Sequence, residues 1–235
     1  MECEILKNGT KVYVDDIVRF GMDALILSRF AITGRLGRVL DMGTGCGIIP
    51  LVAVDRNRGL RYTAIDIDET ACALARRGAA ECAAAERFEV IRADLKQFNG
   101  SAKYDIVTCN PPYFAAGAGR ISRSATAGAA RHELRCTIDD IAAAAMRNLK
   151  QGGTLCLSYR PARLADAICA CRANRLEPKR LRLVRHQPGS EPWVVLLDAR
   201  LDAGVGLEVM DDLIIHRDSG EITDEAAEIL GLKST

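Results

Sequence analysis

The sequence predicts an α/β fold in which a mostly parallel sheet is flanked by helices. Two observations support this prediction. Short β-rich runs alternate with helical stretches along most of the chain, and a glycine-rich turn follows the first of those runs. With 235 residues, of which 49% are hydrophobic, the chain can bury the core of one such domain. We therefore expect a single domain over residues 1–235, with a short N-terminal segment over residues 1–37.

The expected elements alternate in order along the chain. Strands are predicted at residues 38–42, 61–66, 88–92, 104–109 and 154–159, with a closing pair at 179–184 and 193–201. Helices are predicted at residues 48–55, 69–85, 137–149 and 161–174. Thr137 is a typical N-cap, Gly152-Gly153 should stop the third helix, and Pro161 suits the first turn of the fourth. Residues 117–130 are rich in Gly, Ser and Ala, which predicts a loop.

The net charge of +1 conceals a strong asymmetry. Residues 116–187 contain 14 basic and 5 acidic residues, whereas residues 188–235 contain 3 basic and 11 acidic residues. So basic a block indicates a polyanion nearby, and RNA is the partner class that we expect. The alternative is a solvated surface rich in arginine, with the acidic end of the chain balancing the charge away from the substrate face.

Several classes of protein are disfavoured. No apolar run approaches the ~20 residues of a membrane span, and residues 1–7 are acidic and polar, unlike a signal peptide. We therefore expect a cytoplasmic protein with no membrane contact. The nine cysteines are never spaced as Cys-x-x-Cys, and Cys169-x-Cys171 has no nearby His or Cys companion. No metal site is predicted, and the cysteines are expected to pack as small hydrophobes.

A glycine loop, Asp41-Met42-Gly43-Thr44-Gly45-Cys46-Gly47, follows the first strand and opens a helix. Glycines here let the backbone turn tightly and let a ligand approach the main chain. A dinucleotide-binding loop is similar, but its last glycine comes one residue later. The candidate cofactor-binding residues of this loop are Asp41, Gly43, Gly45 and Gly47.

Two acidic residues follow the next two strands. Asp66 closes one strand, where its carboxylate can accept hydrogen bonds from both hydroxyls of a ribose. Asp94 closes the other, where it can accept from an adenine amino group. Both positions lie at the carboxyl edge of the sheet, where open α/β folds bind ligands. Either residue could instead cap the following helix, and Asp68 is expected to be purely a cap. Asp66 alone does not separate NAD from S-adenosylmethionine, since both contain ribose.

The segment Asn110-Pro111-Pro112-Tyr113 follows the fourth strand directly. Its two prolines make a rigid turn, which holds polar groups at the ligand edge. An exocyclic amine or amide nitrogen is a poor nucleophile because its lone pair is conjugated. Hydrogen bonds accepted by the Asn110 side-chain oxygen and the Pro111 carbonyl would free that lone pair, and Tyr113 offers a face for stacking. This catalytic loop suits methyl transfer, in which positioning and electrostatics do most of the work. The bland alternative is a rigid turn.

With these motifs the chain resembles the class I amino-methyltransferases, which share the Asn-Pro-Pro-Tyr loop. More narrowly, it resembles the bacterial N6-adenine methyltransferases that modify adenine 37 in the anticodon loop of a valine tRNA. Residues 19–27, 110–114, 130–133, 159–164 and 177–182 carry this resemblance, which runs over nearly the whole chain. It implies a Rossmann-like, seven-stranded mixed sheet, a target base held by residues 110–113, and S-adenosylmethionine held by Asp41, Gly43, Gly45, Asp66 and Asp94.

The chain departs from the family in two places. The segment before Arg19 is shorter than usual, which bears on how it covers the cofactor. Met42 stands where the family usually has Leu, a minor change in a core.

For the RNA contacts we select cations of the basic block: Arg120, Arg123, Arg131, Lys179, Arg180 and Arg182. The first three lie just beyond the target loop, where they could hold phosphates beside a flipped-out base.

Other functions stay open on the sequence. An N6-adenine methyltransferase of ribosomal RNA or DNA is one close alternative. A protein-glutamine N5-methyltransferase of the release-factor type shares the loop but carries a helical substrate domain, and only about forty residues precede Asp41. A non-catalytic RNA-binding module conflicts with the intact cofactor and target-loop residues. An NAD enzyme is disfavoured by the position of the third glycine.

Overall fold

The computed structural model describes residues 1–32, 36–57, 59–82, 85–111 and 136–232. The strands are β1 (Glu2–Ile5), β2 (Lys11–Val14), β3 (Gly37–Met42), β4 (Leu60–Asp66), β5 (Phe88–Arg92), β6 (Tyr104–Cys109), β7 (Leu149–Tyr159), β8 (Leu176–Arg185), β9 (Pro192–Leu201), β10 (Glu208–Val209) and β11 (Leu213–Ile214). The α-helices are α1 (Met22–Ile32), α2 (Ile48–Arg56), α3 (Glu69–Glu81), α5 (Ile138–Asn148), α6 (Leu164–Ala173) and α7 (Asp224–Ile229). Two short 3-10 turns are η1 (Ala85–Arg87) and η2 (Pro161–Arg163).

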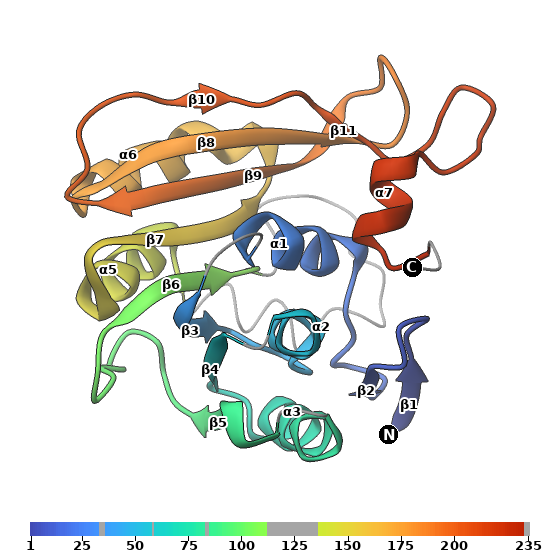
Figure 1. Cartoon of the computed structure of the whole chain (residues 1–235). Helices are drawn as coiled ribbons and strands as arrows, with labels where there is room; N and C mark the ends of the chain where they lie inside the picture. Colours follow the sequence, from blue (N-terminus) through green and yellow to red (C-terminus); the bar gives the residue numbers. More distant parts are fainter. Residues whose placement is uncertain (33–35, 58, 83–84, 112–135, 233–235) are drawn as a thin grey trace.

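One sheet of nine strands forms the centre of the molecule (Figure 1). Its order is β10-β8-β9-β7-β6-β3-β4-β5, and β11 also pairs with β8. Strands β3 to β7 run parallel, whereas β9 lies antiparallel between β7 and β8. The predicted α/β fold is confirmed, and the seven long strands are the seven expected. The two-residue strands β10 and β11 were not predicted and raise the count to nine.

Helices cover both faces of the sheet, because neighbouring side chains of a strand point to opposite faces. Val39 of β3 packs into a core with α1, α2 and α3, whereas Leu40 packs into a second core with α5 and α6. Ile106 and Val107 of β6 divide between the two cores in the same way. Burial on both faces explains why the central strands read as apolar runs.

Some element boundaries differ from the prediction. Helix α3 ends at Glu81 rather than at residue 85, and the predicted fourth helix starts with the turn η2. Thr137 does cap α5, in a capping box with Asp140. However, α5 ends at Asn148 and β7 begins at the next residue, so the glycine pair lies inside a strand instead of stopping a helix. Gly152 has a φ of 72°, and the pairing of β6 with β7 shifts register around it.

The two ends of the chain contain elements that the sequence did not predict. The N-terminal segment forms the hairpin of β1 and β2, followed by α1, which contacts α2 and β7. After β9, the chain adds β10, β11 and α7 (Figure 1). Among the described helices, none has the length and apolar character needed to cross a bilayer.

Candidate functional site

The ends of four parallel strands place the predicted polar residues at one edge of the sheet. Asp41, near the end of β3, pairs with Thr108 of β6, and Asp66 at the end of β4 pairs with Arg92 of β5. Asn110 directly follows β6. Because these strands are parallel, their carboxyl ends meet at the same edge, which is where ligands of this architecture bind.

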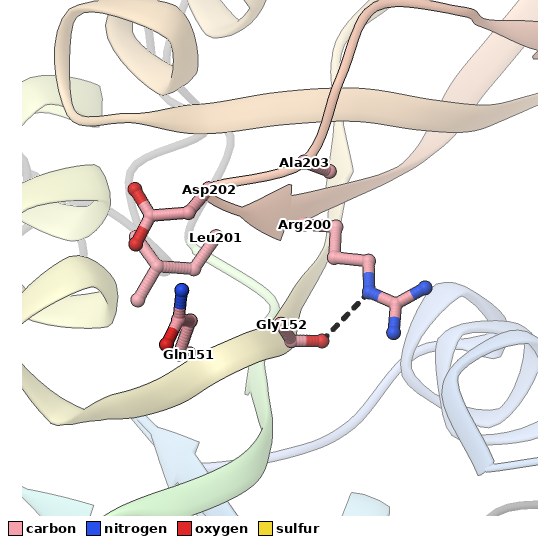
Figure 2. Close-up of a pocket in the computed structure, with 6 residues that line it drawn as sticks. All are labelled: Gln151, Gly152, Arg200, Leu201, Asp202 and Ala203. Atoms are coloured by element: carbon pink, nitrogen blue, oxygen red, sulfur yellow. Dashed lines mark hydrogen bonds between the residues drawn. The ribbon is translucent and has the colours of Figure 1, made fainter.

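Two hollows of the described surface lie elsewhere. Two shallow pockets, of about 440 and 300 Å³, share Gly152 and Arg200. Figure 2 shows the larger one, in which the Arg200 guanidinium donates to the Gly152 carbonyl over 2.8 Å. Gly152 lies near the start of β7 and Arg200 near the end of the antiparallel β9, so this is the amino edge of the sheet. It lies at the edge opposite to the glycine loop and Asn110, and we do not assign it to the reaction.

The glycine loop uses its three glycines in two ways. Gly43, Gly45 and Gly47 have φ values of 69°, 56° and 81°, a left-handed conformation that other residues adopt at a cost. A Cβ on Gly43 would meet no atom within 4 Å, so this stretch of main chain borders open space. A Cβ on Gly47 would instead lie 3.1 Å from the Cβ of Ala75 in α3. Gly43 therefore leaves room for a ligand, whereas Gly47 lets α2 and α3 pack closely.

The N-terminal segment reaches this loop. The Asp15 carboxylate accepts hydrogen bonds from the main-chain N–H groups of Ile17 and Val18, which closes a turn after β2. A Cβ on Gly45 would lie 3.9 Å from Cγ1 of Val18. The turn over residues 15–18 therefore borders the glycine loop from outside the sheet.

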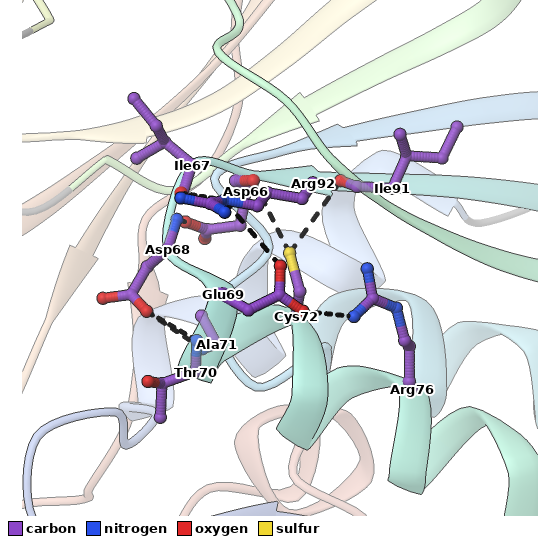
Figure 3. A network of polar contacts seen from close by, with 10 residues as sticks. All are labelled: Asp66, Ile67, Asp68, Glu69, Thr70, Ala71, Cys72, Arg76, Ile91 and Arg92. Atoms are coloured by element: carbon purple, nitrogen blue, oxygen red, sulfur yellow. Dashed lines mark hydrogen bonds and ion pairs between the residues drawn. The ribbon is translucent and has the colours of Figure 1, made fainter.

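Asp66 and Asp68 have different roles (Figure 3). One Asp66 oxygen accepts from the main-chain N–H of Gly45 and the other from that of Asp68, each over 2.9 Å. Asp68 accepts from the N–H groups of Thr70 and Ala71 at the start of α3, so its predicted role as a cap is confirmed. Asp66 braces the glycine loop rather than a helix. A carboxylate has about four lone-pair sites, which leaves acceptor capacity for the hydroxyls of a ribose.

Asp41 lies beneath the glycine loop and is 1% exposed. It accepts a hydrogen bond of 2.6 Å from the Thr108 hydroxyl. Burial raises the pKa of Asp41 to about 6, although the hydrogen bond from Thr108 partly offsets that rise. Within the described chain, the other Asp41 oxygen and the Thr44 hydroxyl are buried and make no hydrogen bond of good geometry, although Thr44 lies close enough to lower the pKa of Asp41. Such orphaned groups cost about 1–3 kcal/mol each, and a ligand with hydrogen-bonding groups would relieve that cost.

Asp94 opens a turn after β5 and is partly buried. Its side chain accepts from the N–H of Lys96 over 2.9 Å, and its carbonyl accepts from Gln97 and Phe98. The alternative that Asp94 caps a helix is wrong, because a turn and not a helix follows it. Asp94 follows β5, which pairs with β4, so it belongs to the same row of strand ends as Asp66.

The Asn110 side chain is held from two sides. Its amide nitrogen donates to the Asp23 carboxylate of α1 over 2.9 Å, and its amide oxygen accepts from the hydroxyl of Ser158 in β7. Ser158 is completely buried. Sequence reasoning missed both partners. Asp23 was visible only as part of a segment that resembles the family, and nothing in the sequence singles out Ser158. Pro111 is partly buried beside Asn110, whereas Pro112 and Tyr113 lie outside the described residues.

Two of the three described candidates for RNA contact have acidic partners within the chain. Arg180 pairs with Asp198 over 2.6 Å, and its guanidinium lies over the ring of Phe30. Arg182 binds both oxygens of Glu225. Lys179 donates to the carbonyl of Gly204. All three cations belong to β8, which is separated from β6 by β9 and β7, so the structure does not bring them to Asn110. The other candidates, Arg120, Arg123 and Arg131, lie outside the described residues.

Neither metal ligation nor a disulfide is found among the described residues. No group of three His, Cys, Asp or Glu side chains is arranged there to hold a metal ion. The nine cysteines are free thiols. Five of them are buried, including Cys109 at the end of β6, where burial raises the thiol pKa well above its usual value. This agrees with a packing role for these five.

The family model of the methyltransferase small domain matches residues 5–163. The chain belongs to this family. One relative, the tRNA1(Val) (adenine(37)-N6)-methyltransferase of Aeromonas hydrophila, is 30% identical over 208 residues, which cover 88% of this chain and 86% of the relative. A protein of the same name from Porphyromonas gingivalis is 30% identical over 219 residues, covering 88% and 85%. These matches extend beyond the family domain into the last third of the chain.

Solved structures agree on the fold. The crystal structure of protein Atu636 from Agrobacterium tumefaciens, described as a predicted O-methyltransferase, has a TM-score of 0.72 and 23% identity, and the match covers 89% of this chain and 95% of that one. The N-methyltransferase NodS from Bradyrhizobium japonicum has a TM-score of 0.56 and 13% identity, covering 77% and 94%. At such identities the likeness concerns the fold alone.

The protein is therefore an S-adenosylmethionine-dependent methyltransferase. The residues at the carboxyl edge fit this cofactor. The open space at Gly43 allows a ligand to contact the main chain. The buried oxygens of Asp41 and Thr44 could form hydrogen bonds with that ligand. The carboxylates at this edge, Asp66 among them, also suit a cofactor that carries a positive sulfonium and a positive ammonium group. When bound, the cofactor supplies the methyl group.

Proposed function

We propose that this methyltransferase modifies the N6 amino group of an adenine in tRNA, namely adenine 37 in the anticodon loop of a valine tRNA. The observation that carries the proposal is the similarity, over 88% of the chain, to relatives named for that reaction. The Asn-Pro-Pro-Tyr loop supports it, since such a loop suits a planar amino nitrogen. The proposed substrate would place the enzyme in the cytoplasm.

The proposed site has two parts. Asp41, Gly43, Gly45, Gly47, Asp66 and Asp94 hold the cofactor, and Asn110, Pro111, Pro112 and Tyr113 hold the base. The ordinary adenine N6 is a poor nucleophile because its lone pair is conjugated with the ring. Acceptors on its two N–H groups, the Asn110 side-chain oxygen and the Pro111 carbonyl, draw the nitrogen toward tetrahedral geometry. The lone pair would then attack the methyl group that the cofactor supplies: the methyl–sulfur bond would break with its electron pair left on sulfur, and the nitrogen would lose one proton to solvent. The site contributes position and electrostatic stabilisation.

The proposed RNA face is centred on the target loop. Arg120, Arg123 and Arg131 follow that loop in the sequence and would hold phosphates next to the flipped base. Arg180 and Arg182 are weaker candidates than the sequence suggested, because their guanidinium groups already bind Asp198 and Glu225. Lys179, which is exposed at its ammonium end and binds only a carbonyl among the described contacts, is retained.

Methylation of defined transcripts tests the function. The enzyme is incubated with S-adenosylmethionine and unmodified valine tRNA, and the nucleosides are analysed by mass spectrometry. We expect one N6-methyladenosine per tRNA, which is lost when adenine 37 is replaced by guanine. A glutamine-containing release-factor peptide, ribosomal RNA and DNA serve as competing substrates. Methyl transfer to one of these, with none to tRNA, would replace the proposed function by the corresponding alternative.

A variant of the loop tests the mechanism on the same substrate. Asn110→Ala removes an acceptor that acts mainly in the transition state, so it should lower kcat by about 100-fold and raise KM much less. The affinity for S-adenosylmethionine should change little. Near-normal turnover in this variant would remove Asn110 from the chemistry.

A further inference from the structure

We infer that Asp23 is a positioning residue, which fixes the side-chain amide of Asn110 in the orientation that methyl transfer requires. The inference rests on the proposed use of the Asn110 oxygen as an acceptor for the target amine. Asp23 lies in the first turn of α1, where an acidic residue is ordinarily explained by the helix dipole. Three features of its surroundings indicate a more specific role.

The first feature is the polarity of the two groups that hold Asn110. A carboxylate can only accept hydrogen bonds, so Asp23 selects the amide nitrogen, which donates to it over 2.9 Å. On the other side of the amide, the hydroxyl of Ser158 donates to the amide oxygen. A flipped amide would set its oxygen against the Asp23 carboxylate. Because the Ser158 hydroxyl can donate or accept, the Asp23 carboxylate is the group that specifies one orientation of the amide.

The second feature is the distance that this contact spans in the chain. Asp23 and Asn110 are 87 residues apart, and their hydrogen bond joins α1 to the residue that follows β6. Helix α1 also contacts β6 and β7, so its position relative to Asn110 is fixed by packing. Ile26 and Leu27 of α1 are almost completely buried. The carboxylate is thus presented to Asn110 by a packed element instead of a loose loop.

The third feature is Gly21. A Cβ at this position would lie 2.3 Å from the Oδ1 atom of Asp23, so the carboxylate would have to shift from its present position. Gly21 is not among the glycines with a positive φ, so the backbone itself does not demand glycine here. The absence of a side chain at Gly21 is instead what leaves space for the Asp23 carboxylate. Glycine at position 21 therefore allows the Asp23 carboxylate to keep its position.

The consequence for the reaction follows from hydrogen-bond polarity. An N–H group of the target amine needs an acceptor, and only the oxygen of the Asn110 amide is one. With the amide flipped, two sets of N–H donors would face each other and the nitrogen would gain no activation. Loss of the Asp23 contact should therefore act on kcat, because the amide would sample both orientations. Binding of the cofactor should be affected far less.

Kinetics of four variants test this role on valine tRNA. Asp23→Ala removes the acceptor, and Gly21→Ala displaces it while keeping its charge. Both should lower kcat by about 10- to 100-fold, with KM for tRNA and the affinity for S-adenosylmethionine within about twofold of the parent. Asp23→Asn, which retains an acceptor oxygen and the shape of the side chain, should recover part of the rate. Asp139→Ala, which removes an exposed carboxylate of α5, is the control for charge and should match the parent.

NMR spectroscopy reports on the environment of the Asn110 side-chain amide directly and does not depend on an activity assay. In the 15N-labelled protein the side-chain NH₂ resonances of Asn110 are identified by their loss in Asn110→Ala. We expect them to shift in Asp23→Ala and Gly21→Ala alike, and less in Asp23→Asn. Unshifted resonances with unchanged kcat would overturn the inference. A large loss of cofactor affinity at unchanged saturated rate would also overturn it, since Asp23 would then be a cofactor ligand.

Failure of the proposed function itself would be seen separately. It would show as the parent enzyme methylating a different substrate, and the ratio of variant to parent kcat on that substrate would still test Asp23. Thermal unfolding of each variant distinguishes a helix-dipole role, which would lower stability without a selective loss of kcat.

Discussion

Asp66 and Asp68 stand two positions apart, yet they serve different partners. Asp68 acts on its own neighbours by capping α3, which a local pattern of an acidic residue before a helix indicates. Asp66 acts across 21 residues, by accepting from the main-chain N–H of Gly45. Only the pairing of β3 with β4 brings those two residues together. Residue roles that depend on local geometry are thus readable in a sequence, whereas those that depend on sheet register need a fold.

This contrast gives a matched pair of variants. Asp66→Ala should weaken S-adenosylmethionine binding by about 1–3 kcal/mol, because ribose hydroxyls and the Gly45 N–H lose their acceptor. Asp68→Ala should cost about 1 kcal/mol of stability through the lost cap and leave cofactor affinity close to that of the parent. Calorimetric titration and thermal unfolding of both variants check the pair. Unchanged affinity in Asp66→Ala would remove this residue from the cofactor site.

The buried carboxyl of Asp41 gives a prediction about pH. Burial raises its folded pKa to about 6, above the value of about 3.9 expected in the unfolded chain. Between these values the folded state binds more protons than the unfolded state, so stability falls as pH rises from about 4 to about 6. Asp41→Asn carries no such proton. The free energy of unfolding of the parent, relative to that variant, should drop by about 2–3 kcal/mol over this range and stay level above it.

Urea unfolding of the parent and Asp41→Asn at a series of pH values measures that difference, since the other titrating groups are common to both proteins. Stability curves that stay parallel from pH 4 to pH 7 would mean that Asp41 titrates normally.

The two residues that bind the Asn110 side chain could not be predicted from the sequence. The Asn-Pro-Pro-Tyr loop is a contiguous motif, and the sequence therefore identifies it. Asp23 and Ser158 lie 87 and 48 residues away from Asn110 along the chain. An aspartate in a helical first turn and a serine in an apolar strand are common, so neither has a distinctive pattern. Their role emerges only when α1, β6 and β7 are packed together.

At the scale of elements, strands β3, β6, β7 and β9 were predictable because both of their faces are buried over much of their length. Each of these four strands contains a mainly apolar run that is bounded by turns or helices. Strands β10 and β11, with two residues each, lack such a run. They are attached to β8 by main-chain pairing and by side chains, as when Arg185 binds Asp212 just before β11. Strand β10 is exposed, and the buried residues Leu213 and Ile215 at β11 form too short an apolar stretch to predict a strand.

The ion pair between β8 and β9 gives a prediction about stability. Asp198 is only 3% exposed at its side chain and pairs with Arg180, which also lies over Phe30 of α1. Arg180→Ala leaves that carboxylate without its guanidinium partner and removes packing, so it should cost about 3 kcal/mol of unfolding free energy. Arg76→Ala, which removes an exposed pair with Glu69, should cost less than about 1 kcal/mol.

Urea unfolding of both variants measures these costs. A cost for Arg180→Ala that is no larger than that of Arg76→Ala would mean that Arg180 is not needed for stability and could serve RNA after all.

For the whole molecule, the net charge of residues 116–187 in the sequence does not give the net charge of the surface that they form in the fold. Part of the positive charge of residues 116–187 is neutralised within the chain. Arg180, Arg182 and Arg185 form ion pairs with acidic residues of segment 188–235. The acidic end of the chain therefore balances charge at β8, which β9 and β7 separate from β6 and Asn110. This agrees with the alternative in which the acidic end lies away from the substrate face. Cations near the target loop in the sequence, such as Arg123, are then the better basis for an RNA face.

Salt dependence of RNA binding tests this division. Each phosphate contact releases condensed counterions, so the logarithm of the binding constant falls with the logarithm of salt concentration, by about 0.7 per contact on a single strand. Arg123→Ala should weaken binding to unmodified valine tRNA and flatten that slope by about one contact. Arg182→Ala, whose guanidinium already binds Glu225, should leave the slope unchanged. Affinity for S-adenosylmethionine should be the same in both variants.

Filter binding of the parent and both variants across a range of salt distinguishes the outcomes. A flatter slope for Arg123→Ala alone supports an RNA face beside the target loop, because only a lost phosphate contact changes counterion release. Equal slopes for all three proteins would mean that the residues after the target loop are a solvated surface. A flatter slope for Arg182→Ala instead would place the RNA on β8, and would require that its ion pair with Glu225 opens when RNA binds.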